Sequence, residues 1–368
     1  MPMKKVFLFL FLINSLIVNA QEEFVEASDS VSIMTRPIRI LSDFLDSRDD
    51  EVYIDGSFVD VSPAVTEVTF GRHTISVQRN GNTVRQRIRI EEVEEVTDTL
   101  QFELYFGLQP TWHQSVTSYA KSVISEIVSN MVYVEEGIFT MGSNHPEADR
   151  DERPAHKVRL SPYFICRYEV TNRQWYAVMS NDSVAHIYEN DNRPKTNINS
   201  IECQAFVDSL RKFTELNFVL PTEAQWEYAA KGGQKSRHTL FSGSSEIDKV
   251  AWFFGNSGEK RQHDESWRPV LLTTNRNRTH DVGQKLPNEL GIYDMTGNVF
   301  EFCSDFFDNY RVKPDVMLTN PKGPSKGQYV VVRGGSWLSE TRQNRVTYRS
   351  SCDFRQKSSA VGLRVVVY

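Results

Sequence analysis

The chain has no excess of basic residues, few cysteines and only one long apolar run. Lysine and arginine total 42 against 48 aspartate and glutamate, a formal net charge of −6 over 368 residues. Because phosphate backbones are bound by basic surfaces, this balance argues against nucleic acid as a partner. A polytopic membrane protein is excluded, since the single apolar run lies at the N-terminus. The length predicts two domains, each with its own core.

The apolar run has the features of an export signal. Lys4 and Lys5 precede an apolar stretch at residues 6–18, and a small residue, Ala20, ends it. An uncleaved membrane anchor is the alternative, but the stretch is short for a span. We therefore expect residues 1–20 to be a signal peptide, with no membrane span after cleavage. The protein is then exported to the periplasm, the cell surface or the medium.

Cysteine is scarce but even in number, and its spacing leaves two interpretations open. The four cysteines are Cys166, Cys203, Cys303 and Cys352, and none forms a CxxC pair or a zinc-knuckle spacing. In an oxidising compartment they would form two disulfides, with three possible pairings. The alternative is four free thiols, mostly buried.

Residues 49–105 have the pattern of a small all-β sandwich. Short alternating runs are separated by turn signals, including Asp55-Gly56 and Asn80-Gly81, a strong hairpin signal. In the run Val84–Ile90, every second residue is an arginine and the residues between them are apolar except Gln86, which predicts a strand with one wet, basic face. Residues 21–48 are more polar and are interpreted as a lead-in segment.

This β module resembles the PEGA family of extracellular β modules. The resemblance rests on a strand followed by an Asp-Gly turn, a Ser62-Pro63 step and a Gly-x-His strand start at Gly71–His73. These features also suit other small β sandwiches.

Helices are predicted at four places farther along the chain. Residues 106–129 carry apolar side chains at helical spacing and are interpreted as a linker helix. Capping boxes at Thr171–Gln174 and Thr222–Gln225 predict two helix starts, and another helix is expected over Ile201–Leu216. Between Lys231 and Pro287 few periodic segments occur, so we expect side-chain hydrogen bonds or ions to hold this region together.

Six motifs in the last 240 residues carry a family resemblance. They are Met131–Gly142, Tyr168–Asn172, Leu220–Ala230, Pro287–Glu301, Arg333–Trp337 and Gly362–Arg364. In this order they resemble the formylglycine-generating enzyme, or sulfatase-modifying factor, family. The resemblance implies an irregular α+β fold over residues 130–368 that is related to C-type lectins. It also implies that the first motif, Met131–Gly142, is a pair of strands.

The chemistry of that family does not transfer to this sequence. The family oxidises a sulfatase cysteine to formylglycine with O2, using copper(I) held by two cysteines after the Gly-Gly-Ser-aromatic motif. Those positions fall on Ser339 and Asn344, whose hard oxygens are poor ligands for copper(I). Cys352 is out of register by eight residues, and the spacing of Arg345 and Arg349 also departs from that of the enzyme. Copper and formylglycine formation are therefore not expected.

A calcium site of the family is better preserved. The resemblance implies that the loop 294–301 coordinates Ca2+ through Asp294 and Glu301 together with the main-chain carbonyls of Gly297 and Val299. Carboxylate and carbonyl oxygens are the ligands that calcium prefers. The alternative is that both acids cap a turn and pair with arginines.

Three functions remain open at this point. We favour a non-catalytic protein that uses the family's peptide groove to bind a peptide, a glycan or a surface protein. The alternatives are a formylglycine-generating oxidoreductase with a displaced site and a diversified, lectin-like ligand-binding protein.

Overall fold

The chain forms two compact units that divide between Gly107 and Leu108. The computed structural model describes residues 35–41, 50–62, 64–79, 82–91, 99–103, 108, 110–180, 182–262, 274–312 and 316–368. The expected signal peptide, Pro63 and the predicted Asn80-Gly81 turn lie outside the described residues.

The N-terminal unit is all β in its described part. Its strands are β1 (Thr35–Leu41), β2 (Glu51–Ile54), β3 (Ser57–Val61), β4 (Ala64–Thr69), β5 (Gly71–Arg79), β6 (Asn82–Ile90) and β7 (Leu100–Glu103). They form a sheet in the order β4-β1-β7 and a second sheet in the order β3-β2-β5-β6. One apolar core joins side chains of both sheets, including Ile38, Ile40, Val52, Ile75 and Ile88. This is the architecture that the alternating pattern predicts.

Strand β1 comes from the segment interpreted as a lead-in. It pairs with β4 and with β7, and Ile38 and Ile40 are fully buried. The lead-in segment therefore contributes a strand to the sandwich. Its alternation of polar and apolar residues is short and is interrupted by Pro37, so the sequence pattern indicated this strand only weakly.

The Asp-Gly turn and the Gly-x-His start of β5 contact each other. Asp55 has a left-handed backbone with φ of 50°, and its Oδ1 accepts a hydrogen bond from Thr74 N at 2.8 Å. Its Oδ2 lies 2.7 Å from His73 Nδ1, while His73 Nε2 lies 2.8 Å from Thr69 O. These motif residues thus fix the turn between β2 and β3 onto β5. Membership of the PEGA family remains a prediction.

The C-terminal unit mixes helices with short strands. Its helices are α1 (Ser118–Ser129), α2 (Asn172–Met179), α3 (Asp182–Ile187), α4 (Ser200–Thr214), α5 (Glu223–Ala230) and α6 (Ile247–Val250), with 3-10 turns η1 (Arg150–Glu152), η2 (Gly233–Lys235) and η3 (Thr341–Asn344). Its strands are β8 (Met131–Val134), β9 (Gly137–Met141), β10 (His156–Leu160), β11 (Tyr163–Cys166), β12 (Phe218–Val219), β13 (Phe300–Phe306), β14 (Leu318–Thr319), β15 (Tyr329–Arg333), β16 (Arg349–Asp353), β17 (Val361–Gly362) and β18 (Val366–Val367).

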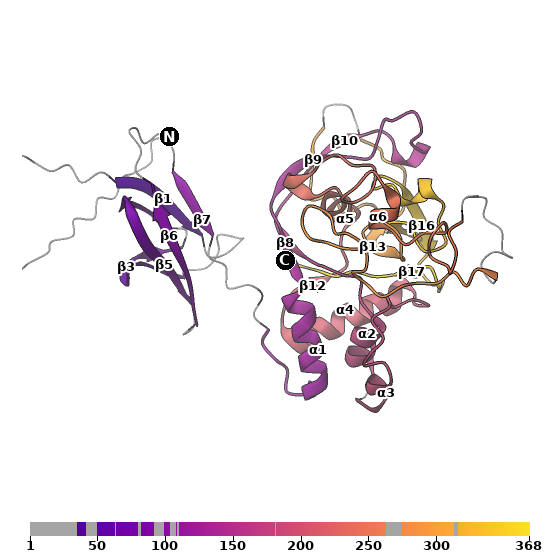
Figure 1. Ribbon diagram of the computed structural model, residues 1–368, viewed down its shortest axis with the longest axis horizontal. Coiled ribbons are helices and arrows are strands. Elements are labelled where there is room, and N and C mark those ends of the chain that lie inside the picture. Colours follow the sequence, from indigo (N-terminus) through magenta and orange to yellow (C-terminus); the bar gives the residue numbers. More distant parts are fainter. Residues whose placement is uncertain are drawn as a thin grey trace, which may run out of the picture. The chain divides into compact units, whose positions relative to one another are not determined.

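In its described residues, this unit is built from three small sheets and a group of helices. The sheets have the orders β14-β10-β9, β12-β18-β11-β8 and β16-β15-β13-β17. Helices α1 to α4 lie together on one side, away from β9 and β10 (Figure 1). Every helix in the part of the chain that the structure describes is too short or too polar to cross a bilayer. The predicted irregular α+β fold is confirmed.

Both predicted capping boxes are present and start α2 and α5. The Thr171 hydroxyl accepts from Gln174 N at 3.2 Å, while Gln174 Oε1 accepts from Thr171 N at 3.1 Å. Thr222 and Gln225 make the same reciprocal pair at 3.2 and 2.9 Å. Each box satisfies two backbone donors that the helix start would leave unpaired. The helix expected over Ile201–Leu216 is α4.

Two segments differ from their predicted roles. Helix α1 is not a linker, because Ala120, Ile124 and Ile127 are buried in the core of the C-terminal unit. The motif Met131–Gly142 forms two strands, as expected, but they do not pair together. Strand β8 pairs with β11 and β9 pairs with β10.

Side-chain amides hold the irregular segment after α5, as the sparse periodicity predicts. Asn277 Nδ2 donates to Phe254 O and to Ser257 Oγ at 3.0 and 2.7 Å. Asn275 Nδ2 donates to Lys260 O at 3.0 Å. These buried contacts replace the backbone ladders that helices and strands would supply.

Candidate functional site

The predicted calcium loop is fastened to the Arg333–Trp337 motif. Gly297 N donates to Gly334 O, and Trp337 N donates to Asn298 O, both at 2.8 Å. Gly297 has φ of 79°, and a Cβ there would lie 2.4 Å from the carbonyl oxygen of Trp252. Only glycine therefore fits this position without moving the neighbouring backbone. The two motifs, far apart in sequence, form one site.

Asp294 is the most exceptional side chain of this loop. It is 3% exposed; its Oδ2 accepts from Gly283 N at 2.7 Å, and its Oδ1 is buried with no hydrogen-bond partner. Burial raises the pKa of Asp294 to about 6. A buried carboxylate oxygen without a partner is costly unless a proton or a cation satisfies it. The donor fits a hard cation such as calcium.

Glu301 lies in the same site but is already engaged. Its carboxylate accepts from the Arg364 guanidinium at 2.7 to 3.1 Å and from Trp226 Nε1 at 2.8 Å. Both Glu301 and Arg364 have 0% exposed side chains. A cation at this loop would therefore share Glu301 with Arg364. Val299 is fully buried beside Glu301, within the same loop as Gly297.

A third buried carboxylate, Glu169, was not identified from the sequence. Its oxygens accept from Asn298 Nδ2 at 2.6 Å and from Val299 N at 3.1 Å. Burial raises the pKa of Glu169 well above its usual value, and the nearby carboxylates of Asp294 and Glu301 raise it further. Glu169 and Asp294 lie close enough to Arg364 to interact with its charge, but only Glu301 pairs with it directly, so this site holds more buried carboxylates than arginines. Protons or a cation would balance that excess of negative charge. Among the described residues, no group of three His, Cys, Asp or Glu side chains is arranged to hold a metal ion.

The two positions of the copper cysteines are occupied by hydrogen-bonded polar side chains. Ser339 is 3% exposed, and its Oγ accepts from Ser336 N at 2.9 Å. Asn344 is fully buried on η3, where its Nδ2 donates to Glu340 O at 2.8 Å. A hydroxyl and an amide supply no thiolate, so these residues do not fit a copper(I) ion.

None of the four cysteines rebuilds a thiolate pair. All four are free thiols, so the two-disulfide alternative is wrong, and Cys166, Cys203 and Cys303 are buried. Burial raises the pKa of each buried thiol, which disfavours the thiolate. Cys352 is on β16 and is partly exposed; burial also raises its pKa.

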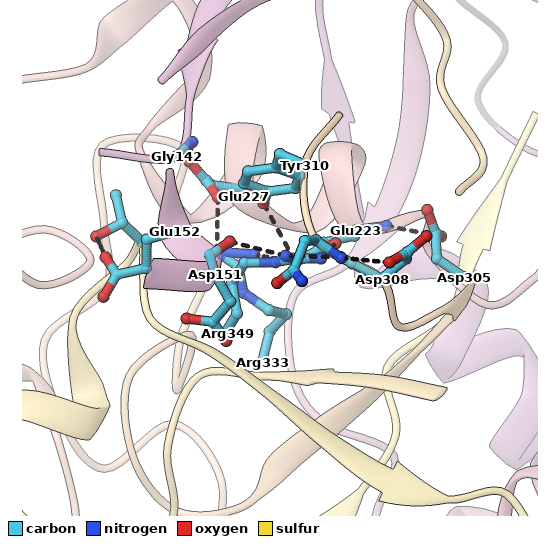
Figure 2. A network of polar contacts seen from close by, with 12 residues as sticks. Gly142, Asp151, Glu152, Glu223, Glu227, Asp305, Asp308, Tyr310, Arg333 and Arg349 are labelled. Atoms are coloured by element: carbon cyan, nitrogen blue, oxygen red, sulfur yellow. Dashed lines mark hydrogen bonds and ion pairs between the residues drawn. The ribbon is translucent and has the colours of Figure 1, made fainter. Parts of the chain in front are cut away.

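A buried ion-pair network ties the remaining family motifs together (Figure 2). The Glu223 carboxylate accepts from Arg333 Nη1 at 2.8 Å and from Arg349 Nε and Nη2 at 2.6 and 2.7 Å. Arg333 Nη2 donates to Glu227 at 2.7 Å, and Gly142 N donates to the same carboxylate at 2.8 Å. Burial alone would raise the pKa of Glu223, but the two arginines bring it below the usual value. The charged side chains of these motifs therefore pair with one another.

The arginines after the copper positions have structural partners. Arg345 Nη2 donates to Glu152 Oε1 at 2.6 Å, and Thr347 Oγ1 donates to Glu152 Oε2 at 2.6 Å. Arg349 also donates to the carbonyls of Asp151 and Asp308 at 2.8 and 3.0 Å. These contacts hold η1 against the C-terminal part of the unit. They give both buried arginines partners within the protein, so no substrate is needed to account for their positions.

Comparisons with known proteins match this geometry to one family. The family model of the sulfatase-modifying factor enzyme 1-like domain matches residues 120–368. The chain is 31% identical to the chaperone protein LppX of Paenibacillus barcinonensis, over 65% of this chain and 90% of that protein. It is 26% identical to a formylglycine-generating enzyme of Thermomonospora curvata, over 64% of this chain and 92% of that protein. Among solved structures, Treponema denticola variable protein 1 is similar, with a TM-score of 0.52, 26% identity and coverage of 64% of this chain and 94% of that one.

Proposed function

Because the chain belongs to the sulfatase-modifying factor enzyme 1-like family, we propose that it is an exported, non-catalytic member that binds a peptide, glycan or surface-protein partner. The observation that carries the proposal is the pair Ser339 and Asn344. Both side chains are buried and hydrogen-bonded to their own segment. The fold is retained while the positions that would hold copper(I) carry no sulfur.

One relative supports a binding role, because it is named a chaperone protein. Neither its name nor that of the similar variable protein describes an oxidase. The relative named as a formylglycine-generating enzyme has a similar extent of match, which makes catalysis the outcome to be tested.

The decisive experiment is a copper and turnover assay. We expect the purified protein, incubated with copper, oxygen, a reductant and a sulfatase-derived cysteine peptide, to retain no copper(I) and to form no aldehyde. Mass spectrometry of the peptide and metal analysis of the protein measure these outcomes. The double variant Ser339→Cys/Asn344→Cys is the matched comparison, and we expect it to gain copper without gaining turnover, because the neighbouring arginines are committed elsewhere. Aldehyde formed by the unaltered protein would make it an enzyme.

We also propose that the Asp294–Glu301 loop binds calcium. The support is the unpartnered Asp294 Oδ1 and the excess of buried carboxylates over arginine in this site. Asp294 and Glu301 would supply carboxylate oxygens, and Gly297 and Val299 would supply carbonyls. When bound, the ion supplies positive charge to a buried acidic cluster, which stabilises the folded state.

Calcium is expected to raise the melting temperature of the C-terminal unit. At a hundredfold excess over its dissociation constant, a ligand of the folded state adds about 2.7 kcal/mol to the free energy of unfolding. Asp294→Asn should weaken this gain without disturbing Arg364, which a change at Glu301 would leave unpaired. The control Asp281→Asn removes an exposed carboxylate and should keep the full gain. Melting curves with calcium and with a chelator that coincide for the unaltered protein would mean that the loop is only a turn.

A further inference from the structure

The N-terminal sandwich has one sheet face that the core does not use. In the sheet β3-β2-β5-β6, side chains alternate between two faces. The face toward the other sheet carries Val52, Ile75, Val77, Ile88 and Ile90. The opposite face therefore carries the residues between them in each strand.

Arginines gather along the β6 end of this outer face. Arg85, Arg87 and Arg89 alternate along β6 and are exposed, about 6.8 Å apart from one to the next. Arg72 is exposed on β5 and lies directly opposite Arg89. Arg89 pairs with Glu91 at 3.1 Å, whereas no carboxylate among the described residues pairs with Arg72, Arg85 or Arg87. Like charges directly opposite across two strands are unfavourable without a counter-charge.

Two aromatic rings lie on the same face at its other end. Tyr53 of β2 and Phe58 of β3 are register partners in an edge-to-face pair, with ring centroids 5.7 Å apart and an interplanar angle of 73°. Phe58 is 53% exposed. Tyr53 Oη donates to Glu51 of the same strand at 2.8 Å, so the hydroxyl is satisfied at the surface and the ring of Tyr53 stays on this face.

The register joins the aromatic and basic ends into one row. Ser76 of β5 is paired with Tyr53 on one side and with Arg85 on the other. The row Phe58–Tyr53–Ser76–Arg85 thus crosses all four strands, about 14 Å from first to last. Ser76 is only 7% exposed, so it forms the floor between the ring and the guanidinium.

We propose that this face binds an anionic polysaccharide whose sugar rings carry carboxylates. Sugar rings present C–H faces that pack on exposed aromatic rings, and guanidinium groups bind carboxylates in a bidentate manner. The row places both kinds of contact side by side, and Arg87 and Arg72 extend the positive charge along the strands. An acidic peptide would use the arginines but would have no need of Phe58. The arginines could instead serve only to keep the edge strand β6 from pairing with other chains, in which case they would bind neither the polysaccharide nor the peptide.

The test is binding of the full protein to polygalacturonate, measured by retardation in affinity gels and by titration calorimetry. We expect binding that weakens with salt and is absent with dextran, a neutral polysaccharide. Arg85→Gln/Arg87→Gln should weaken it about tenfold, and Phe58→Ala should weaken it about threefold. The control Arg237→Gln/Arg311→Gln removes the same charge from two side chains in the other unit that are 75% and 79% exposed, and it should bind normally.

Two results would overturn the proposal. Equal binding of polyglutamate and polygalacturonate, with no effect of Phe58→Ala, would show a general polyanion surface. No binding of polygalacturonate by the unaltered protein would assign the arginines to protection of the β6 edge. Unchanged far-ultraviolet circular dichroism of each variant verifies that the sandwich is folded, so that lost binding reports the surface.

Discussion

Replacing Glu223 with glutamine will lower the free energy of unfolding of the C-terminal unit by about 3–5 kcal/mol. Glu223 is 4% exposed and accepts from two buried arginines at once. Glutamine keeps one acceptor oxygen but loses the charge. Arg333 would retain Glu227, while Arg349 would remain buried without a carboxylate partner. The cost is that of an uncompensated buried charge rather than of one hydrogen bond.

Urea unfolding followed by tryptophan fluorescence measures this change selectively. All six tryptophans lie between residues 112 and 337, so the signal reports only the C-terminal unit. The control Glu246→Gln breaks an exposed pair with Lys249 and should change stability by less than about 1 kcal/mol. Equal unfolding midpoints for the two variants would show that the network contributes no more than a surface ion pair.

The helix starts were predictable from the sequence because capping is local. Thr171 and Gln174 are three residues apart, and their contact requires nothing from the rest of the chain. The ion pair of Glu223 with Arg333 joins residues 110 positions apart, and its partners follow only from the packing of α5 against β15. The sequence motifs indicated where these charges are, but not whether they face each other or a substrate.

In the candidate site, too, the contacts between distant motifs could not be predicted from the sequence. Asp294 and Glu301 were found because both lie in one motif, whereas Glu169 and Arg364 lie in two other motifs, 132 and 63 residues from Glu301. The charge excess of the site depends on all four residues. One of the two alternatives from the sequence was that these acids pair with arginines. The structure contains such a pair, Glu301 with Arg364, but it also leaves an oxygen of Asp294 without a partner.

The structure separates the charges that maintain the fold from the positions that would support catalysis. Glu223, Arg333 and Arg349 satisfy one another in the interior, so they are needed whatever the domain binds. The side chains of Ser339 and Asn344 form hydrogen bonds only within their own segment, so thiols at these positions could be exchanged for other side chains without disturbing that network. A chain with this arrangement can lose oxidation chemistry and keep a stable scaffold for recognition.

Asp305 gives the C-terminal unit a pH dependence opposite to that of most carboxylates. It is 4% exposed on β13, and its Oδ2 accepts from Glu223 N at 2.9 Å. Burial, and then the nearby Glu223 carboxylate, raise the pKa of Asp305 from 3.8 to about 7. Between about pH 4 and pH 7 the folded state therefore holds a proton that the unfolded state has lost. The free energy of unfolding falls as the pH rises through this window, by about 4 kcal/mol for three pKa units.

Asp305→Asn should remove the contribution of Asp305 to this dependence and stabilise the unit at high pH. The amide oxygen still accepts from Glu223 N, but the side chain has no charge to bury. We expect the variant to be more stable than the unaltered protein by about 4 kcal/mol at pH 8, because the ionised carboxylate is costly there, and by only about 1.5 kcal/mol at pH 5, where the folded state still holds the proton. Tryptophan-detected urea unfolding at both pH values measures the difference, and Asp208→Asn, an exposed carboxylate on α4, is the control that should show no such change. A difference between Asp305→Asn and the unaltered protein that is the same at pH 5 and pH 8 would mean that Asp305 does not titrate between them, because the substitution would then act only through packing.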